Sequence, residues 1–154
     1  DIKWRIVAYG DGPTRPYFEA RYRNLCRELP NIEVELPGWI SPTDVPMAMR
    51  KAVVVITAGM AGMRACGSGT LTIGAGANAT VGVQSGSNLR AGLWSNFGDH
   101  GIQRFTPSSI EADLEQIWSR DLYDQTVEST RNVVGATRRQ SLVDQSMLGA
   151  LQCL

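Results

Sequence analysis

The chain has 154 residues, and its 15 lysines and arginines balance 15 aspartates and glutamates, so the formal net charge at pH 7 is zero. A chain of this length buries roughly two-thirds of its unfolded surface, so one globular domain needs neither a metal nor disulfides to hold it together. The balanced charge argues against a protein whose main activity is binding nucleic acid or an anionic membrane, because both require a concentrated basic surface.

Cysteine usage and hydropathy bear on location. Cys26, Cys66 and Cys153 are odd in number and contain no C-x-x-C pair, which argues against a disulfide framework and a cysteine zinc site. The longest apolar run, Ala52 to Ile56, is far short of the ~20 residues that a membrane span needs. We therefore expect a cytoplasmic protein without a transmembrane segment. The missing initiator Met and an immediate strand pattern suggest that the chain was cut from a longer polypeptide.

The chain opens with a strand pattern and a helix pattern. Residues 4–9 are rich in β-formers and end in the turn cluster Gly10-Asp11-Gly12-Pro13. A helix is predicted over residues 16–29, in which Glu19 and Arg23 form an i,i+4 pair. We expect its apolar stripe to pack on a sheet; the stripe comprises Phe18, Tyr22, Leu25 and Leu29.

The middle of the chain continues this alternation. Residues 32–36 alternate apolar and acidic side chains and predict a half-exposed strand, and an N-cap pattern at 41–44 predicts a short helix ending near Lys51. The continuous β-branched run Val53–Ile56 is typical of a parallel strand buried on both faces. A short helix and another strand follow, at Met60–Cys66 and Leu71–Ile73. This alternation predicts a Rossmann-like, three-layer α/β/α fold with a mostly parallel sheet.

The C-terminal third has helical periodicity. Thr106 and Pro107 predict an N-cap and the first residue of a helix whose apolar stripe comprises Ile110, Leu114, Ile117 and Trp118. Two further helices are indicated by Tyr123, Val127 and Val134, and by Val143, Met147 and Leu151. We expect a single domain over residues 1–154, with strands and helices in 1–105 and closing helices in 106–154.

Glycine clustering is the feature that points most directly to a site. Eleven of the 16 glycines fall between Gly59 and Gly101. Glycines beyond the carboxyl end of a buried strand let the backbone approach a ligand, and a helix N-terminus offers N–H groups to a phosphate. Gly59–Gly62 has this place, although its spacing is neither G-x-G-x-x-G nor a P-loop. The alternative is that these glycines serve turns and tight packing.

Other residues allow a functional and a plain interpretation. Gly10–Pro13 either lines the same cleft or forms an ordinary turn. His100, beside Asp99, is either a general base or a solvated loop histidine. Arg64 either reaches a phosphate or carboxylate in the cleft or makes a surface salt bridge. Trp39 either stacks on a base or sugar or forms a core edge. No metal site is expected, and the Gly-Asn-Ser-rich segment 75–100 predicts a flexible loop.

The order of motifs in the first 75 residues resembles the C-terminal, donor-binding domain of GT-B glycosyltransferases, of the family 4 kind. The motifs that carry the resemblance are a strand ending in Gly10-Asp11-Gly12-Pro13, then Asn31-Ile32-Glu33-Val34, Pro37-Gly38-Trp39-Ile40 and Ala52-Val53-Val54-Val55. By this resemblance the chain is one half of a GT-B fold. It would bind a UDP- or GDP-sugar as substrate, with no other cofactor, for transfer to a hydroxyl acceptor, as in polysaccharide biosynthesis.

The resemblance also implies where the donor lies. The Gly10–Gly12 turn lines the cleft, the backbone of Gly38, Trp39 and Ile40 contacts the base, and Gly59, Met60, Ala61 and Gly62 lie beside the diphosphate and sugar. The acceptor-binding N-terminal domain of such an enzyme is missing. The isolated chain is therefore expected to be inactive as a hexosyltransferase, because transfer requires both domains to close on the donor.

The sequence departs from the family pattern at Leu71, which replaces a proline of the family, and at Arg64. The family presents a donor-binding Glu where this sequence has Arg64. A guanidinium cation cannot accept hydrogen bonds from ribose hydroxyls. Three explanations follow: the donor is bound differently, the ligand is more anionic, or catalysis is lost. A second hypothesis is thus a non-catalytic Rossmann-like module that binds a ligand or partner. A third, a GT-B-shaped epimerase, requires more histidines and carboxylates in the cleft than one His suggests.

Overall fold

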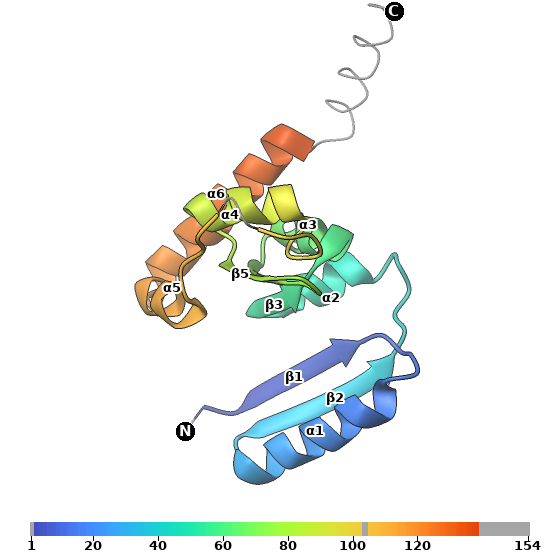
Figure 1. Ribbon diagram of the computed structural model, residues 1–154. Helices are drawn as coiled ribbons and strands as arrows, with labels where there is room; N and C mark the ends of the chain where they lie inside the picture. The colour runs from blue at the N-terminus through green and yellow to red at the C-terminus, as the bar shows by residue number, and fades with distance from the viewer. Residues whose placement is uncertain (1, 103–104, 139–154) are drawn as a thin grey trace, which may run out of the picture. The chain divides into compact units, whose positions relative to one another are not determined.

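The computed structural model describes residues 2–102 and 105–138 (Figure 1). The chain divides into two compact units, Asp1–Val45 and Pro46–Leu154, here called the first and second units. Both units contain helices and strands, and each contains a parallel pair of strands. The prediction of an α/β protein with parallel strand pairing is therefore confirmed, whereas the single domain over 1–154 stays a prediction.

The first unit is one β-α-β element. Strand β1 (Trp4–Tyr9) and strand β2 (Ile32–Gly38) run parallel, with Ile6 opposite Val34. Helix α1 (Arg15–Glu28) connects them and lies along the strand pair (Figure 1). The alternation of apolar and acidic residues in β2 and the helical stripe of α1 thus predicted all three elements correctly.

Of two expectations for α1, packing of its stripe on the strands is confirmed in part, and the ion pair is wrong. Its stripe is only partly covered: Phe18 and Leu29 are exposed, Tyr22 and Leu25 are half-buried, and no residue of the helix is fully buried. Glu19 pairs with Arg15 rather than Arg23, at 2.7 Å between Oε1 and Nε. Both pairings satisfy helical spacing, and Arg15 is preferred because its other guanidinium nitrogens are anchored by Asp11 and the Leu36 carbonyl.

The second unit surrounds a three-stranded sheet with the order β3-β4-β5. The strands β3 and β4 are parallel, whereas β4 and β5 are antiparallel, so this sheet is mixed. Its elements are α2 (Val45–Lys51, which begins at the unit boundary), β3 (Val54–Thr57), α3 (Gly59–Ser68), β4 (Leu71–Ala75), β5 (Thr80–Val83), α4 (Gly86–Ser95), α5 (Ile110–Gln116) and α6 (Arg120–Arg138).

The predicted burial of the first strand of this sheet is wrong. Val53 precedes β3 and is 64% exposed, and Ile56 within β3 is 67% exposed because the strand lies at the edge of the sheet with β4 as its neighbour. The strand buried on both faces is β4, in which residues 71–74 are all buried. Its small and polar residues, Thr72 and Gly74, conceal that burial from a reading of hydropathy alone.

The expectation of a flexible loop over 75–100 is also wrong. This segment contains β5 and α4, and its buried side chains include Val81, Val83, Leu89 and Phe97. Phe97 joins Cys66 and Val134 in one hydrophobic cluster, and Val83 joins Leu71 and Ile73 in another. The segment predicted to be a loop therefore supplies much of the core.

Helices α5 and α6 cover the second cluster, through Ile110, Leu114, Ile117, Tyr123 and Val127. The N-cap of α5 is Ser109, whose Oγ accepts from Ala112 N, and not Thr106 as predicted. Trp118 is 81% exposed and lies off the packed stripe. The third predicted helix, at Val143 to Leu151, lies outside the described residues. Among the described helices, none has both the length and the apolar character needed to cross a bilayer.

Candidate functional site

The predicted donor-binding residues fall into two groups, one in each unit. Gly10, Gly12, Gly38, Trp39 and Ile40 belong to the first unit, and Gly59, Met60, Ala61, Gly62 and Arg64 belong to the second. Within each unit the residues gather where a strand ends.

In the first unit, Gly10 and Gly38 meet at the carboxyl ends of β1 and β2. The Gly10 N–H donates to the Gly38 carbonyl at 2.8 Å. Both have positive φ, 125° and 86°, a region that side chains rarely adopt. Glycine at both positions allows the two strand ends to turn together.

Arg15 stabilises this turn, although the sequence analysis did not identify it as a site residue. Its guanidinium pairs with Asp11 at 3.1 Å and Glu19 at 2.7 Å, and donates to the Leu36 carbonyl at 2.9 Å. The hydrogen bond with Glu19 and the charge of Asp11 raise the pKa of Arg15. Asp11 Oδ1 also accepts from Gly12 N, so the loop and the start of α1 are fixed to each other. The sequence signal that could have identified Arg15 is a cation two residues after a G-x-G-P turn.

Trp39 and Ile40 follow the Gly38 turn directly. The Trp39 side chain is 80% exposed, whereas Ile40 is half-buried. Trp39 is therefore not a core-edge residue within the described structure. An indole in this position is open to stacking with a planar ring.

In the second unit, Gly59 begins α3 immediately after β3. Its φ is 60°, and its N–H donates to the Asn96 carbonyl at 2.9 Å. The N-cap residue Ala58 has an extended backbone and no capping side chain. Gly59 is buried, Met60 is exposed and Ala61 is half-buried, so the first turn of α3 is covered on one side only.

Gly62 faces the protein interior. A Cβ at Gly62 would lie 2.8 Å from Cδ1 and Cδ2 of Phe97, whose ring is buried. Similar close approaches occur at Gly74 and Gly92, which contact the Gln84 side chain, and between the backbones of Gly76 and Gly98. For these five glycines the structure supports the packing interpretation.

Asp99 lies against the first residue of α3. Its Oδ2 is 2.9 Å from the Cβ position of Gly59 and accepts from Asn96 Nδ2 at 3.2 Å, while Asn78 Nδ2 donates to its carbonyl. The sequence argument considered Asp99 only as a partner of His100. His100 is exposed, and the carboxylate of Asp99 is instead held by Asn96.

Arg64 lies on the exposed face of α3, one turn after Met60. It makes no ion pair or hydrogen bond with another residue in the part of the chain that the structure describes. The surface salt bridge considered as the plain alternative is therefore not formed there. A guanidinium without a carboxylate partner retains its full capacity to bind an oxyanion.

A buried polar network ties β5 to the start of α5 and was not predicted. Asp113, which is 8% exposed, accepts from Asn88 Nδ2 at 2.9 Å, from Val83 N at 3.2 Å and from Ser108 Oγ at 2.6 Å. Three donors satisfy this buried carboxylate, which forms no ion pair within residues 2–102 and 105–138. Its hydrogen bonds all connect elements of the core, so we assign it a structural role.

Metal-ligating and thiol groups offer no further centre. No cluster of three or more His, Cys, Asp or Glu side chains suited to a metal occurs within 2–102 and 105–138. Cys26 and Cys66 are free thiols, and burial raises the pKa of Cys66 to about 11. Cys66 is thus protonated at neutral pH and unsuited to nucleophilic chemistry.

Comparison of the chain with protein-family models, with curated proteins and with solved structures gives no match. The two strand-end turns, the exposed Trp39 and the charges beside α3 are therefore the observations on which a function can be argued.

Proposed function

We propose that the chain is the nucleotide-sugar-binding half of a GT-B glycosyltransferase that transfers a sugar from UDP- or GDP-sugar to a hydroxyl acceptor. The observation that carries the proposal is a repeated one: in both units a positive-φ glycine closely follows a parallel strand, Gly10 directly after β1 and Gly59 two residues after the end of β3. Ligands of α/β proteins bind at such carboxyl ends.

The proposal gives each group a role. In the first unit, the Gly10–Gly38 turn presents backbone groups and Trp39 supplies an exposed indole for the base. In the second unit, the first turn of α3 supplies N–H groups for the diphosphate. The leaving diphosphate is then stabilised without a metal while an acceptor hydroxyl attacks the sugar carbon.

The charges near α3 determine how the donor is held. A diphosphate next to Asp99 experiences repulsion, whereas Arg64, which has no ion-pair partner among the described residues, attracts it. In the proposal Arg64 therefore pairs with a phosphate. The Asp99 carboxylate accepts hydrogen bonds from sugar hydroxyls, since hydroxyls are donors that a carboxylate binds well. This arrangement takes over the donor contact that the family's Glu provides.

The proposal is tested by titrating the chain with UDP, GDP and their sugar conjugates and following backbone amides by NMR. We expect one nucleoside diphosphate to shift Gly12, Trp39 and Gly59–Arg64. The variant Arg64→Gln should weaken binding about ten-fold, because one charge-assisted phosphate contact is lost. Arg90→Gln, an exposed arginine on α4, is the matched control and should bind as the wild type does. Equal weakening in both variants would argue against a specific phosphate contact.

The second candidate function is a non-catalytic module that binds a partner or ligand. It is favoured by one observation, the Arg64 cation at the place of the family's donor-binding Glu. It predicts no response to any nucleoside diphosphate. That silence separates it from the first proposal, whereas the variant Arg64→Glu tests the role of residue 64 in donor binding: restored affinity for the sugar nucleotide supports the family alignment, lost affinity supports a phosphate contact by Arg64, and unchanged affinity argues against both.

A further inference from the structure

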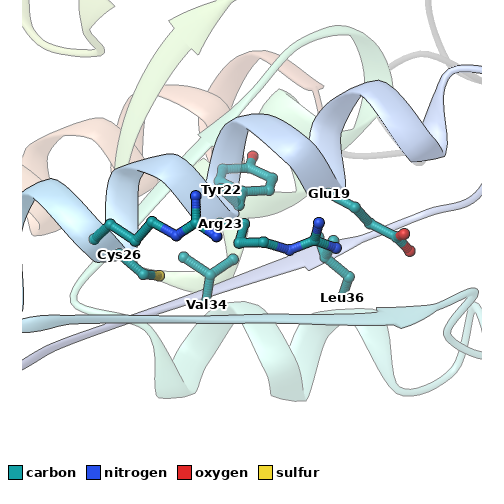
Figure 2. A pocket seen from close by; sticks show the side chains of 7 residues that line it. Glu19, Tyr22, Arg23, Cys26, Val34 and Leu36 are labelled. Carbon is teal, nitrogen blue, oxygen red and sulfur yellow. The ribbon is translucent and has the colours of Figure 1, made fainter.

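The first unit also contains a groove that none of the predicted donor-binding residues lines. Its volume is about 460 Å³, and it lies between α1 and β2 (Figure 2). Val34 and Leu36 of β2 form its apolar floor, and Tyr22, Arg23, Cys26 and Arg27 of α1 line its other side. All of these residues belong to the first unit.

The charges of this groove are unbalanced. Arg23 and Arg27 make no ion pair or hydrogen bond with other residues among those the structure describes. Glu19, the acidic residue that lines the groove, is bound by Arg15 at 2.7 Å, and Figure 2 shows its carboxylate at the end remote from Cys26. Two like charges one helical turn apart destabilise a helix slightly when nothing neutralises them.

We propose that this groove binds an organic phosphate, with the phosphate group between Arg23 and Arg27 and the apolar part of the ligand on Val34 and Leu36. Guanidinium groups match phosphate oxygens in bidentate geometry, and a spacing of one turn lets both reach the same group. The apolar floor distinguishes this site from a basic patch, because it favours a phosphate ester over the free ion. The inference is independent of the proposed nucleotide-sugar site.

Phenyl phosphate and inorganic phosphate are suitable probes. We expect phenyl phosphate to shift the Nε–Hε resonances of Arg23 and Arg27 and to bind roughly ten-fold more tightly than inorganic phosphate, since its ring covers apolar surface. Binding should weaken as the pH falls from 7.5 to 5.5, because a phosphate ester loses its second negative charge near pH 6 whereas arginine stays charged.

Variants on α1 test the assignment. The double variant Arg23→Gln/Arg27→Gln should lose at least ten-fold in affinity for phenyl phosphate. Arg21→Gln removes the same charge from the same helix outside the groove and should change affinity less than two-fold. Equal losses in the two proteins would overturn the proposal, because they would indicate a diffuse electrostatic effect.

Cys26 provides a second readout inside the groove. In a Cys153→Ser background, Cys26 is the accessible thiol because Cys66 is buried and protonated. Phenyl phosphate should slow the reaction of Cys26 with a neutral maleimide at least three-fold. An unchanged rate at saturating probe would overturn the proposal. Amide shifts confined to Gly59–Arg64 would also overturn it while leaving the proposed nucleotide-sugar site intact.

Discussion

Two segments of similar length contrast in how they are built. Residues 4–38 form β1, α1 and β2, and their hydropathy pattern predicts all three elements, yet α1 buries no residue fully. Residues 71–98 form β4, β5 and α4, most of which the pattern misses, yet they contain Leu71, Val83 and Phe97 of the core. Of these two segments, the one whose elements the hydropathy pattern predicts better is therefore the less buried.

The contrast has a physical origin. Amphipathic periodicity arises where one face of an element meets solvent, as in α1. An element enclosed on all sides has no polar face to mark its period. Where backbones also approach closely, as at Gly76 and Gly98, the residues must be small, and small residues carry little hydropathy signal. A glycine-rich core thus has the composition of a loop.

Among the glycine substitutions, the largest effect is expected from Gly98→Ala. Gly98 has a φ of 99°, and an added Cβ would overlap the Ala79 carbonyl and lie 2.7 Å from Gly76 N. Strain and overlap with backbone atoms together should cost about 4 kcal/mol of unfolding free energy. Chemical denaturation measures this loss.

Gly12→Ala is the control from the other segment. Gly12 has no heavy atom within 4 Å of its Cβ position. Its substitution should change stability by less than about 0.5 kcal/mol. If Gly98→Ala behaved like this control, the glycines of residues 71–98 would not be there for packing.

The fold was predictable where side chains alternate between solvent and interior. Glu33 and Glu35 between apolar neighbours identified β2, and the turn at Gly10–Pro13 identified the end of β1. The burial of β3 was overestimated because Val53–Ile56 has the composition of a central strand but occupies a sheet edge. Which strand lies at an edge depends on long-range pairing that a local pattern does not contain.

The candidate site was predictable in its turns and not in its charged partners. Gly10, Gly38 and Gly59 were identified because glycine after a strand is a local signal. The partners of Arg15 include the Leu36 carbonyl, and Asp99 reaches Gly59 from a turn forty residues away in sequence. Such pairings exist only once the chain is folded.

The next largest effect is the loss of folding stability at high pH that ionisation of Cys66 causes. Desolvation raises its pKa from 9.0 to about 11, so in this range the folded state retains a proton that the unfolded state has lost. Titration of Cys66 therefore leaves the free energy of unfolding unchanged below pH 9. As the pH rises toward 11, that free energy falls by about 2 to 3 kcal/mol in total. Denaturation curves from pH 8 to 11 should show this extra loss in the wild type but not in Cys66→Ala. Parallel profiles for the two proteins would contradict the burial of the thiol.

Two glycines of the same helix should respond with opposite signs. Gly62→Ala places a methyl group against the buried Phe97 ring and should cost about 1.5 kcal/mol, even after the helix propensity of Ala is counted. Gly67 is exposed with open space around it, and Gly67→Ala should gain about 0.5 to 1 kcal/mol. Thermal and chemical denaturation both measure the difference, and a gain in both variants would mean that α3 does not pack closely on Phe97.

The smallest effect is expected in the well-predicted segment. Phe18 is 48% exposed although it belongs to the stripe that identified α1, and it contacts the rings of Tyr17 and Tyr22 rather than a core. Phe18→Ala should cost about 1 kcal/mol, whereas the same change at the buried Phe97 should cost about 3 to 5 kcal/mol. Equal costs, measured by chemical denaturation, would mean that α1 has a covered face after all. The expected difference between the two costs instead follows from burial, since a residue can contribute to a clear helical pattern and still stabilise the helix little.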